Sequence, residues 1–190
     1  MKNIVLFGPP GAGKGTQAEK LIAKYGLDHV STGDVIRAEI KSGSELGKLV
    51  KSYTDKGELV PDQVVIDIIA DYVLKHKTGN GNIFDGFPRT TFQAEEFDKI
   101  LAANGLKVDV MLSLTVPDEE LVKRLLLRGK DSGRADDSNE DVIKNRISVY
   151  KAQTAVVADY YAAQNKYAEI NGVGGIDEIF GRLCEVIDTL

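Results

Sequence analysis

Residues 3–16 read NIVLFGPPGAGKGT, an apolar run that stops abruptly at glycine and proline. The run over residues 3–7 predicts a buried strand, the glycines after it predict a loop, and residues 14–25 are compatible with a helix. A glycine loop between a strand and a helix lets successive backbone N–H groups surround an anion, and the helix N-terminus and Lys14 add positive charge. The stretch therefore predicts a phosphate-binding loop.

The lysine of this loop is followed by Gly15 and only then by Thr16. The generic pattern has Ser or Thr directly after the lysine, so a hydroxyl that contacts Mg²⁺ is out of its usual register here. A glycine-rich turn without a ligand is the alternative interpretation. Three glycines around a lysine at a strand–helix junction favour phosphate binding over that alternative.

Beyond the loop, strand patterns alternate with helix patterns. Further strands are predicted over residues 28–31, 82–85, 108–116 and 167–170. Helices are predicted over 33–41, 44–55, 92–103, 118–128 and 176–187, with one opened by Pro61 and a long one through residues 143–161. Residues 129–139 are rich in Gly, Ser, Asp and Asn and predict a mobile surface loop.

This alternation predicts an α/β fold of the phosphate-loop type, a parallel five-stranded sheet with helices on both faces. In such sheets ligands bind outside the carboxyl ends of the strands. The residues predicted at those ends are Gly8, Ser31, Asp85, Gly86, Asn171 and Gly172.

The composition is that of an ordinary globular protein: 190 residues, 43% hydrophobic and 28% charged, with a net charge of −5. It predicts a single domain over residues 1–190 and argues against disorder and against nucleic-acid binding. Cys184 is the only cysteine, which excludes an internal disulfide and a multi-cysteine zinc site. The sequence has neither a signal-peptide pattern nor an apolar run of about 20 residues, so we expect a cytoplasmic protein without a membrane partner.

Only seven of the 24 cationic side chains are arginine: Arg37, Arg89, Arg124, Arg128, Arg134, Arg146 and Arg182. Arginine presents a planar fork that binds phosphate through two parallel hydrogen bonds, which lysine cannot reproduce. Arg124 and Arg128 are four residues apart and share a helix face. Each arginine alone is compatible with an ordinary surface ion pair. Together with a phosphate loop, the set favours a ring that clamps phosphates.

His29 and His76 are the only histidines, and we expect neither to neighbour another candidate catalytic group. No Ser-His-Asp or Cys-His arrangement is apparent. Catalysis without an evident proton shuttle suits phosphoryl transfer, which depends on positioning and charge stabilisation. Asp85, at the end of a predicted strand, is the natural carboxylate for Mg²⁺, directly or through water. Its alternative role is a turn or helix cap.

Four separated motifs resemble those of one family: GPPGAGKGT at 8–16, STGDVIR at 31–37, DGFPRT at 85–90 followed by Gln93, and RADD at 134–137. Over essentially all of its length the chain resembles the adenylate kinases of the short-lid type, among the nucleoside monophosphate kinases. The resemblance implies Mg²⁺-dependent, reversible transfer of the terminal phosphoryl group of ATP to AMP, which gives two ADP and maintains adenine nucleotide balance. It also implies a monomer.

The resemblance further implies roles for individual residues, which we state as expectations. The ATP-binding residues are Gly11, Ala12, Gly13, Lys14, Gly15, Thr16, Arg128 and Gly174. The AMP-binding residues are Thr32, Arg37, Glu58, Leu59, Val60, Gly86, Phe87, Pro88, Arg89, Gln93, Arg134 and Arg146. The catalytic residues are Lys14, Arg89, Arg124, Arg128, Arg134 and Arg146.

Some of these roles are specific. Gln93 would read the adenine edge, and Arg37 and Arg89 would hold the AMP phosphate. Arg124 and Arg128 would face the ATP phosphates. The remaining pair of catalytic arginines, Arg134 and Arg146, would close over the transferring group, with Asp136 and Asp137 helping to hold the lid, and the backbone near Gly174 would touch the ATP adenine.

The family organisation divides the chain into a core, residues 1–30, 61–128 and 140–190, and two mobile parts. These are a monophosphate-binding flap over residues 31–60 and a short lid over residues 129–139. The lid has no Cys or His, so we expect no zinc. Closing both parts would expel water and strengthen the arginine contacts.

Two other functions stay open at this point. A sister kinase for UMP or CMP usually has Ala in place of Thr32 and Asn after the Gly-Phe-Pro-Arg motif, so Thr32, Thr90 and Gln93 favour adenine. A non-enzymatic nucleotide switch of the GTPase type would need an Asn-Lys-x-Asp motif. The nearest match, residues 165–168, reads NKYA and lacks the Asp.

Overall fold

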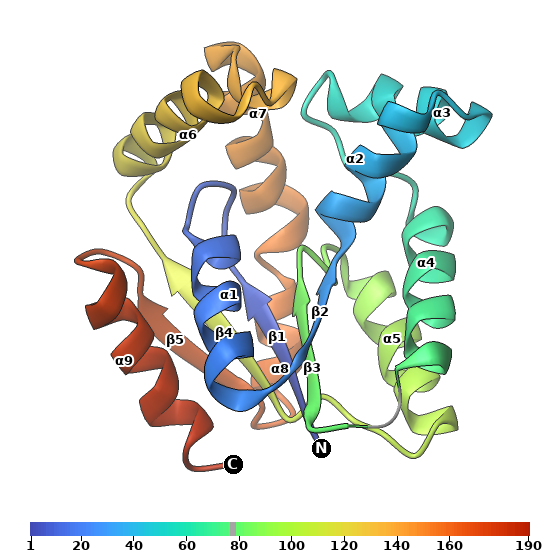
Figure 1. The fold of residues 1–190 in the computed structure, drawn as a ribbon, viewed down its shortest axis with the longest axis vertical. Coiled ribbons are helices and arrows are strands. Elements are labelled where there is room, and N and C mark those ends of the chain that lie inside the picture. The colour runs from blue at the N-terminus through green and yellow to red at the C-terminus, as the bar shows by residue number, and fades with distance from the viewer. Residues whose placement is uncertain (77–78) are drawn as a thin grey trace.

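The computed structural model describes residues 1–76 and 79–190. Its centre is a five-stranded sheet in the order β2-β3-β1-β4-β5, in which every pairing is parallel. The strands are β1 (Lys2–Phe7), β2 (Asp28–Ser31), β3 (Gly81–Asp85), β4 (Val110–Thr115) and β5 (Tyr167–Asn171). The predicted α/β fold with a parallel five-stranded sheet is confirmed (Figure 1).

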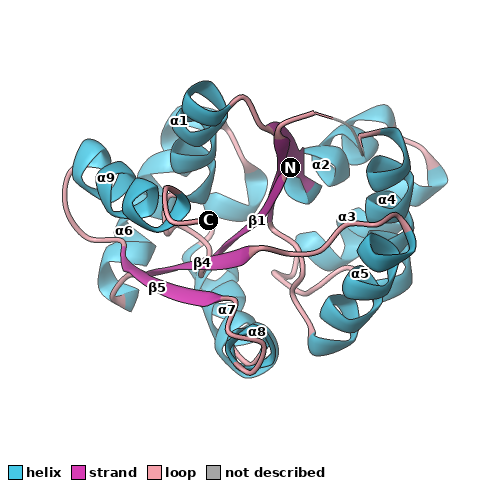
Figure 2. Ribbon diagram, turned by 90° about the horizontal axis from the view of Figure 1, so that it is seen from below, coloured by secondary structure: helices cyan, strands magenta, loops and turns pink. Residues whose placement is uncertain are grey.

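Helices cover both faces of this sheet (Figure 2). Successive strand residues point to opposite faces. Ile4 and Leu6 therefore pack with residues of α1 (Lys14–Tyr25), α6 (Asp118–Ser132), α7 (Glu140–Val149) and α9 (Ile176–Ile187). Val5 and Phe7 pack on the other side with α4 (Asp62–Lys75), α5 (Thr91–Ala103) and α8 (Val157–Ala162). Each large side chain buried in these cores contributes about 1.5–3 kcal/mol to stability.

Two helices, α2 (Thr32–Ser42) and α3 (Glu45–Thr54), stand beyond the carboxyl end of the sheet as a separate arm (Figure 1). Each begins at a serine whose hydroxyl accepts a hydrogen bond from a backbone N–H in the first turn, Ser31 from Asp34 and Ser44 from Gly47. The two helices pack closely, because a Cβ on Gly47 would lie 2.1 Å from the Glu39 carbonyl oxygen. Both helices lie within residues 31–60, for which the flap stays a prediction.

The segment predicted as a loop over residues 129–139 is largely helical, so that prediction is wrong. Helix α6 continues to Ser132 and ends at Gly133, whose φ of 64° closes the helix in the left-handed region. A 3₁₀ turn, η1 (Ala135–Asp137), follows. Gly129 is required here because a Cβ on it would lie 2.4 Å from the Asp137 carbonyl oxygen. The glycine therefore allows close packing and does not end the helix.

The long helix predicted through residues 143–161 is interrupted. Between α7 and α8 the chain forms a π-helical turn, η2 (Tyr150–Thr154). Such turns occur often at functional sites, and both Tyr150 and Thr154 line the main cavity. Within the described residues, no helix is long and apolar enough to span a bilayer.

Candidate active site

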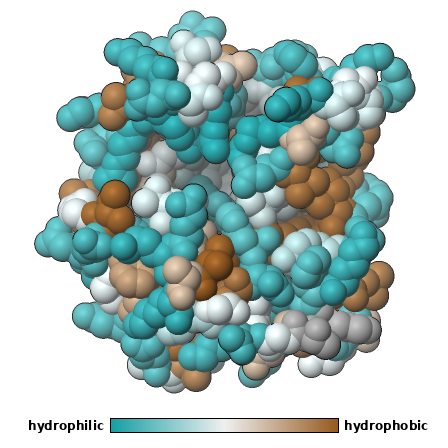
Figure 3. Space-filling view, viewed as in Figure 1, coloured by the Kyte–Doolittle hydropathy of each residue, from teal (hydrophilic) through white to brown (hydrophobic). Residues whose placement is uncertain are grey.

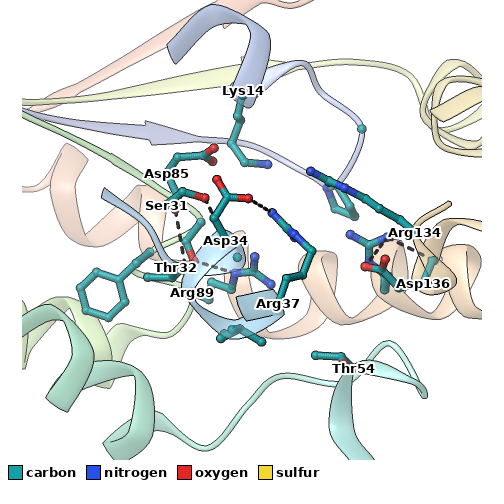
Figure 4. A pocket seen from close by; sticks show the side chains of 18 of the residues that line it. Lys14, Ser31, Thr32, Asp34, Arg37, Thr54, Asp85, Arg89, Arg134 and Asp136 are labelled. Carbon is teal, nitrogen blue, oxygen red and sulfur yellow. Dashed lines mark hydrogen bonds and ion pairs between the residues drawn. The ribbon is translucent and has the colours of Figure 1, made fainter. Parts of the chain in front are cut away.

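A cavity of about 910 Å³ lies at the carboxyl ends of the strands. Around this end the surface is mostly hydrophilic (Figure 3). Several elements contribute to its lining: the phosphate loop, α2, the segment after α3, the segment after β3, α6, the turn η1 and α7. Most residues predicted for ATP and AMP line it, as do the six arginines other than Arg182. Figure 4 shows Lys14, Asp85, Arg37, Arg89 and Arg134 directed into one space.

The lysine of the phosphate loop is held by backbone carbonyls of the same loop. The Lys14 ammonium donates hydrogen bonds to the carbonyl oxygens of Gly8, at 2.9 Å, and Pro9, at 3.1 Å. Gly11 and Gly13 adopt φ values of 84° and 93°, which favour glycine. Burial lowers the pKa of Lys14 to about 8; nearby arginines add to this effect and Asp85 opposes it. Additional negative charge at the loop would therefore stabilise the ammonium.

Not every residue of the predicted ATP set faces the cavity. Ala12 is 1% exposed and its side chain packs in the core. Gly174 lies outside the cavity lining, in the turn before α9, with a φ of 125°. A Cβ there would meet the Glu178 carboxylate at 2.7 Å. Gly174 thus shapes the turn beside the site.

The predicted acceptor residues form one hydrogen-bonded group. Thr32 donates through its hydroxyl to the Gly86 carbonyl oxygen at 3.0 Å, and Arg89 donates to the same oxygen through Nε at 2.7 Å. Gly86 has a φ of 82°, and a Cβ on it would lie 2.9 Å from the Thr32 hydroxyl. The loss of hydration of the Arg89 guanidinium within the protein lowers the pKa of Arg89. The positive charge of Arg146 adds to this effect, and the negative charge of Asp85 opposes it.

Gln93 is 1% exposed and its amide is held at both ends. Its Oε1 accepts from the backbone N–H of Arg89 at 2.8 Å, and its Nε2 donates to Oδ1 of Asp62 at 2.7 Å. Thr90 donates to the same Asp62 oxygen at 3.0 Å and accepts from the Gln93 backbone N–H, which caps α5. Sequence reasoning missed Asp62, because it belongs to none of the four motifs.

Arg128 and Arg146, the lid-side arginines of this site because they contact the predicted lid at Asp137, converge on one carboxylate. Arg128 makes two hydrogen bonds to Asp137, at 2.5 and 3.0 Å, and Arg146 donates to it at 2.7 Å. The Asp137 side chain is fully buried. Burial alone would raise its pKa, but the hydrogen bonds and charges of Arg128 and Arg146 prevail and lower it. Arg134 also lines the cavity and, within the described residues, makes no ion pair.

Arg124 lies apart from these arginines. Its Nε pairs with Glu120 at 3.0 Å, and its Nη2 donates to the Gly172 carbonyl oxygen at 3.1 Å. It therefore holds the turn after β5 while still lining the cavity. Sequence spacing placed it beside Arg128, but it could not show that Gly172, 48 residues away, would attract its guanidinium.

Asp85 and His29 face each other, with 4.0 Å between Oδ2 and Nε2. The expectation that neither histidine neighbours a candidate catalytic group is therefore wrong. Strands β2 and β3 pair with His29 opposite Ile83, so His29 and Asp85 point to the same face. The His29 Nε2 is buried without a hydrogen-bond partner in the described part of the chain. No cluster of three potential metal-ligating side chains occurs within residues 1–76 and 79–190.

Comparisons with known proteins identify the family of this chain. The adenylate kinase family model matches residues 6–166. An adenylate kinase of Bacteroides thetaiotaomicron is 56% identical over 190 residues, which cover all of both chains. One of Flavobacterium psychrophilum is 52% identical over the same full length. One of Porphyromonas gingivalis is 46% identical over 188 residues, 99% of this chain and 96% of its own. The chain belongs to the adenylate kinase family.

Proposed function

We propose that this protein transfers the terminal phosphoryl group of ATP reversibly to AMP and so forms two ADP. The observation that carries the proposal is the convergence of Lys14, Arg89, Arg128, Arg134 and Arg146 on one cavity beside a phosphate loop. A phosphoryl group that passes between two nucleotides carries negative charge on its equatorial oxygens, which such cations stabilise. Family membership supports the same reaction.

The donor nucleotide would bind at the phosphate loop. Backbone N–H groups from Gly11 to Thr16 and the positive end of α1 would surround its phosphates. The Lys14 ammonium would exchange its two carbonyl partners for phosphate oxygens. The ATP adenine would lie near the turn containing Gly174, where Arg124 fixes the backbone through the Gly172 carbonyl.

The acceptor nucleotide would bind between α2, the segment over residues 57–60, and the segment after β3. Arg37 and Arg89 would hold its phosphate, and Gln93 would contact its base, because these side chains line that part of the cavity. Thr32 would support the site through its bond to Gly86. The reaction needs no protein base, because catalysis rests on position and charge.

Closure would complete the site. In this proposal residues 31–60 would move as the flap and residues 129–139 as the short lid, against a core of residues 1–30, 61–128 and 140–190. Closing them would exclude water, which suppresses hydrolysis of ATP and strengthens the arginine contacts. We further propose that the protein acts in the cytoplasm as a monomer. The unpaired, buried Cys184 agrees with a reducing compartment.

Asp85 fits a magnesium ion bound with ATP. Mg²⁺ usually keeps several waters and is held by one or two carboxylates together with substrate phosphates. Asp85 supplies one such carboxylate beside the phosphate loop, and its side chain is 14% exposed. Bound there, the ion would neutralise charge on the phosphates. His29 would limit the orientations that the Asp85 carboxylate can take.

The test is a coupled assay of ADP formation with ATP and each of AMP, GMP, CMP and UMP. AMP should give the highest kcat/KM. An Arg89→Ala variant should raise the KM for AMP by about 10- to 100-fold, since a charge-assisted bidentate contact contributes about 1.5–3 kcal/mol. The KM for ATP should change little. Higher activity with CMP or UMP would identify the sister kinase instead, and loss of ATP binding alone would reverse the two pockets.

A further inference from the structure

Gln93 reaches the cavity from α5 with an amide that already has two fixed partners. We propose that Asp62 fixes the direction in which this amide faces and thereby makes the acceptor pocket select 6-aminopurine over 6-oxopurine monophosphates. The inference rests on the proposed function, in which Gln93 contacts the acceptor base. It assigns a specificity-determining role to a residue of α4 that does not line the cavity.

The two partners permit one orientation of the amide. The Asp62 carboxylate can only accept hydrogen bonds, and the Arg89 backbone N–H can only donate. The Gln93 NH₂ group must therefore face Asp62 and its oxygen must face Arg89, as observed at 2.7 and 2.8 Å. A rotated amide would bring two acceptors together at Asp62 and two donors together at Arg89. The chemistry of the partners thus identifies which amide atom is oxygen.

Burial makes the rotated state costly. Gln93 is 1% exposed, so water cannot restore the two lost hydrogen bonds. Asp62 is itself held in place, because Thr90 donates to the same oxygen while capping the helix that carries Gln93. The carboxylate, the cap and the amide therefore form one connected network between the first turns of α4 and α5.

The fixed orientation determines what remains for a ligand. One N–H and one oxygen lone pair of Gln93 are still unused. Adenine presents an acceptor at N1 and a donor at its 6-amino group, which complements this pair. A 6-oxopurine presents a donor at N1 and an acceptor at O6, which is the opposite pattern. A glutamine that could rotate would accept both bases, whereas one fixed by Asp62 accepts only the first.

The experiment compares AMP with inosine monophosphate, which differs from AMP only at these two positions of the base. In an Asp62→Asn variant the side chain at 62 can donate as well as accept hydrogen bonds. Only the Arg89 backbone N–H then disfavours the rotated Gln93 amide. We expect the ratio of kcat/KM for AMP to that for inosine monophosphate to fall about tenfold, with the KM for ATP unchanged. Asp67→Asn is the matched control, because Asp67 on the same helix also accepts from a glutamine amide but in an exposed pair.

A second variant separates the role of Asp62 from that of Gln93. Gln93→Leu should abolish most of the preference for AMP; if the preference survives, Gln93 does not read the base, and both the acceptor assignment and this inference fail. If Gln93→Leu removes the preference while Asp62→Asn and Asp62→Ala retain it, only the role of Asp62 is overturned. The side-chain NH₂ resonances of Gln93, followed by NMR, should shift in Asp62→Asn before any nucleotide is added. Unchanged resonances in a folded variant would also contradict the proposal.

Discussion

The two halves of the cavity are held by different kinds of bond. On the acceptor side, Thr32 and Arg89 bind the Gly86 carbonyl, and Gln93 is fixed between Arg89 and Asp62. On the lid side, Arg128 and Arg146 share the carboxylate of Asp137. The first set consists mostly of directional bonds to backbone and amide groups. The second is a charge cluster in which Asp137 pairs with both arginines and Asp136 pairs with Arg146 at 3.3 Å.

This difference separates recognition from charge stabilisation. Directional, buried hydrogen bonds fix the shape of a pocket before a ligand arrives, as recognition of a base requires. An arginine paired with a carboxylate can instead face either that carboxylate or a phosphate, because both offer oxygens in a similar geometry. The acceptor half should therefore respond to mutation mainly in substrate choice, and the lid half mainly in turnover and in stability as pH changes.

The largest effect is expected at Lys14, which lies between the halves. Lys14→Ala should lower kcat by about 100- to 1,000-fold, because it removes a preorganised charge at the transferring phosphoryl group. AMP binding measured without ATP should change by less than about twofold, since the acceptor network does not include Lys14. Steady-state kinetics and calorimetry test both statements.

Lys20→Ala is the control, because Lys20 lies on the same helix in an exposed pair with Asp177. It should leave kcat within about twofold of the wild type. If Lys14→Ala weakened AMP binding as strongly as it lowered turnover, the two halves would not be separable at this residue.

The next effect is expected in stability at Asp137. Since the pKa of this carboxyl is lowered in the folded protein, the stability it contributes is present above its unfolded pKa of about 4 and is lost as pH falls through the lower folded value. Asp137→Asn should reduce the free energy of unfolding at pH 7 by about 1–3 kcal/mol, because two arginines lose their shared anion. Denaturant unfolding at pH 7, 5 and 3 measures this.

Below about pH 4, where acid removes this contribution from the wild type, the variant should lose less stability than the wild type. Asp131→Asn serves as the control, since Asp131 is exposed on α6. If the free energy of unfolding fell equally with pH in the wild type and in Asp137→Asn, the charge cluster would not behave as one unit.

Sequence patterns predicted those features of the fold and of the cavity that depend on local chemistry. The phosphate loop, the order of strands and helices, and the gathering of motifs at one edge of the sheet all follow from short stretches and from the geometry of parallel sheets. Helix α6 was predicted too short, because glycine and polar residues disfavour a helix in isolation, whereas packing of Gly129 against the lid turn extends it in the fold.

The parts that could not be predicted are those that join distant segments. The approach of His29 to Asp85 depends on the pairing of β2 with β3. Helix spacing placed Arg124 on the same face as Arg128, but it could not predict that the Arg124 guanidinium donates to a carbonyl beyond β5. Asp62 belongs to no motif, and only its hydrogen bond with the side chain of Gln93 indicates a role in the acceptor pocket.

A smaller effect is expected from pH on the donor side. Because burial lowers the pKa of Lys14 to about 8, the free protein loses this charge as pH rises above 8, whereas bound phosphates favour the protonated form. ATP affinity should therefore fall about fivefold between pH 8 and pH 9 at fixed magnesium concentration, with proton uptake on binding. AMP affinity should change less.

Isothermal titration at pH 7, 8 and 9, in buffers of different ionisation enthalpy, measures both affinity and proton uptake. In Lys14→Ala the decline should disappear. An equal decline of ATP affinity in that variant would show that another group titrates. Lys14 would then not account for the different pH responses of the two halves.

The smallest effect is expected where the two halves touch. Asn145 of α7 donates to the Lys56 carbonyl oxygen at 2.5 Å, and a Cβ on the adjacent Gly57 would lie 2.7 Å from Cγ of Arg146. Residues 57–60, which form the acceptor wall of the cavity, thus pack against α7, the helix that carries Arg146. Asn145→Ala should raise the KM for AMP by about two- to threefold, the effect of one exposed hydrogen bond, and leave the KM for ATP unchanged.

Lys144→Ala is the matched control, because Lys144 occupies the next position of the same helix in an exposed pair with Glu140. Gly57→Ala should have a larger effect than Asn145→Ala, since it forces the wall away from Arg146 and strains a φ of 72°. If Gly57→Ala lowers kcat while Asn145→Ala changes only the KM for AMP, the wall positions Arg146 by packing. The hydrogen bond from Asn145 to Lys56 then only limits the mobility of the wall. If neither variant affects AMP, the halves act independently and the contact between them has no part in the reaction.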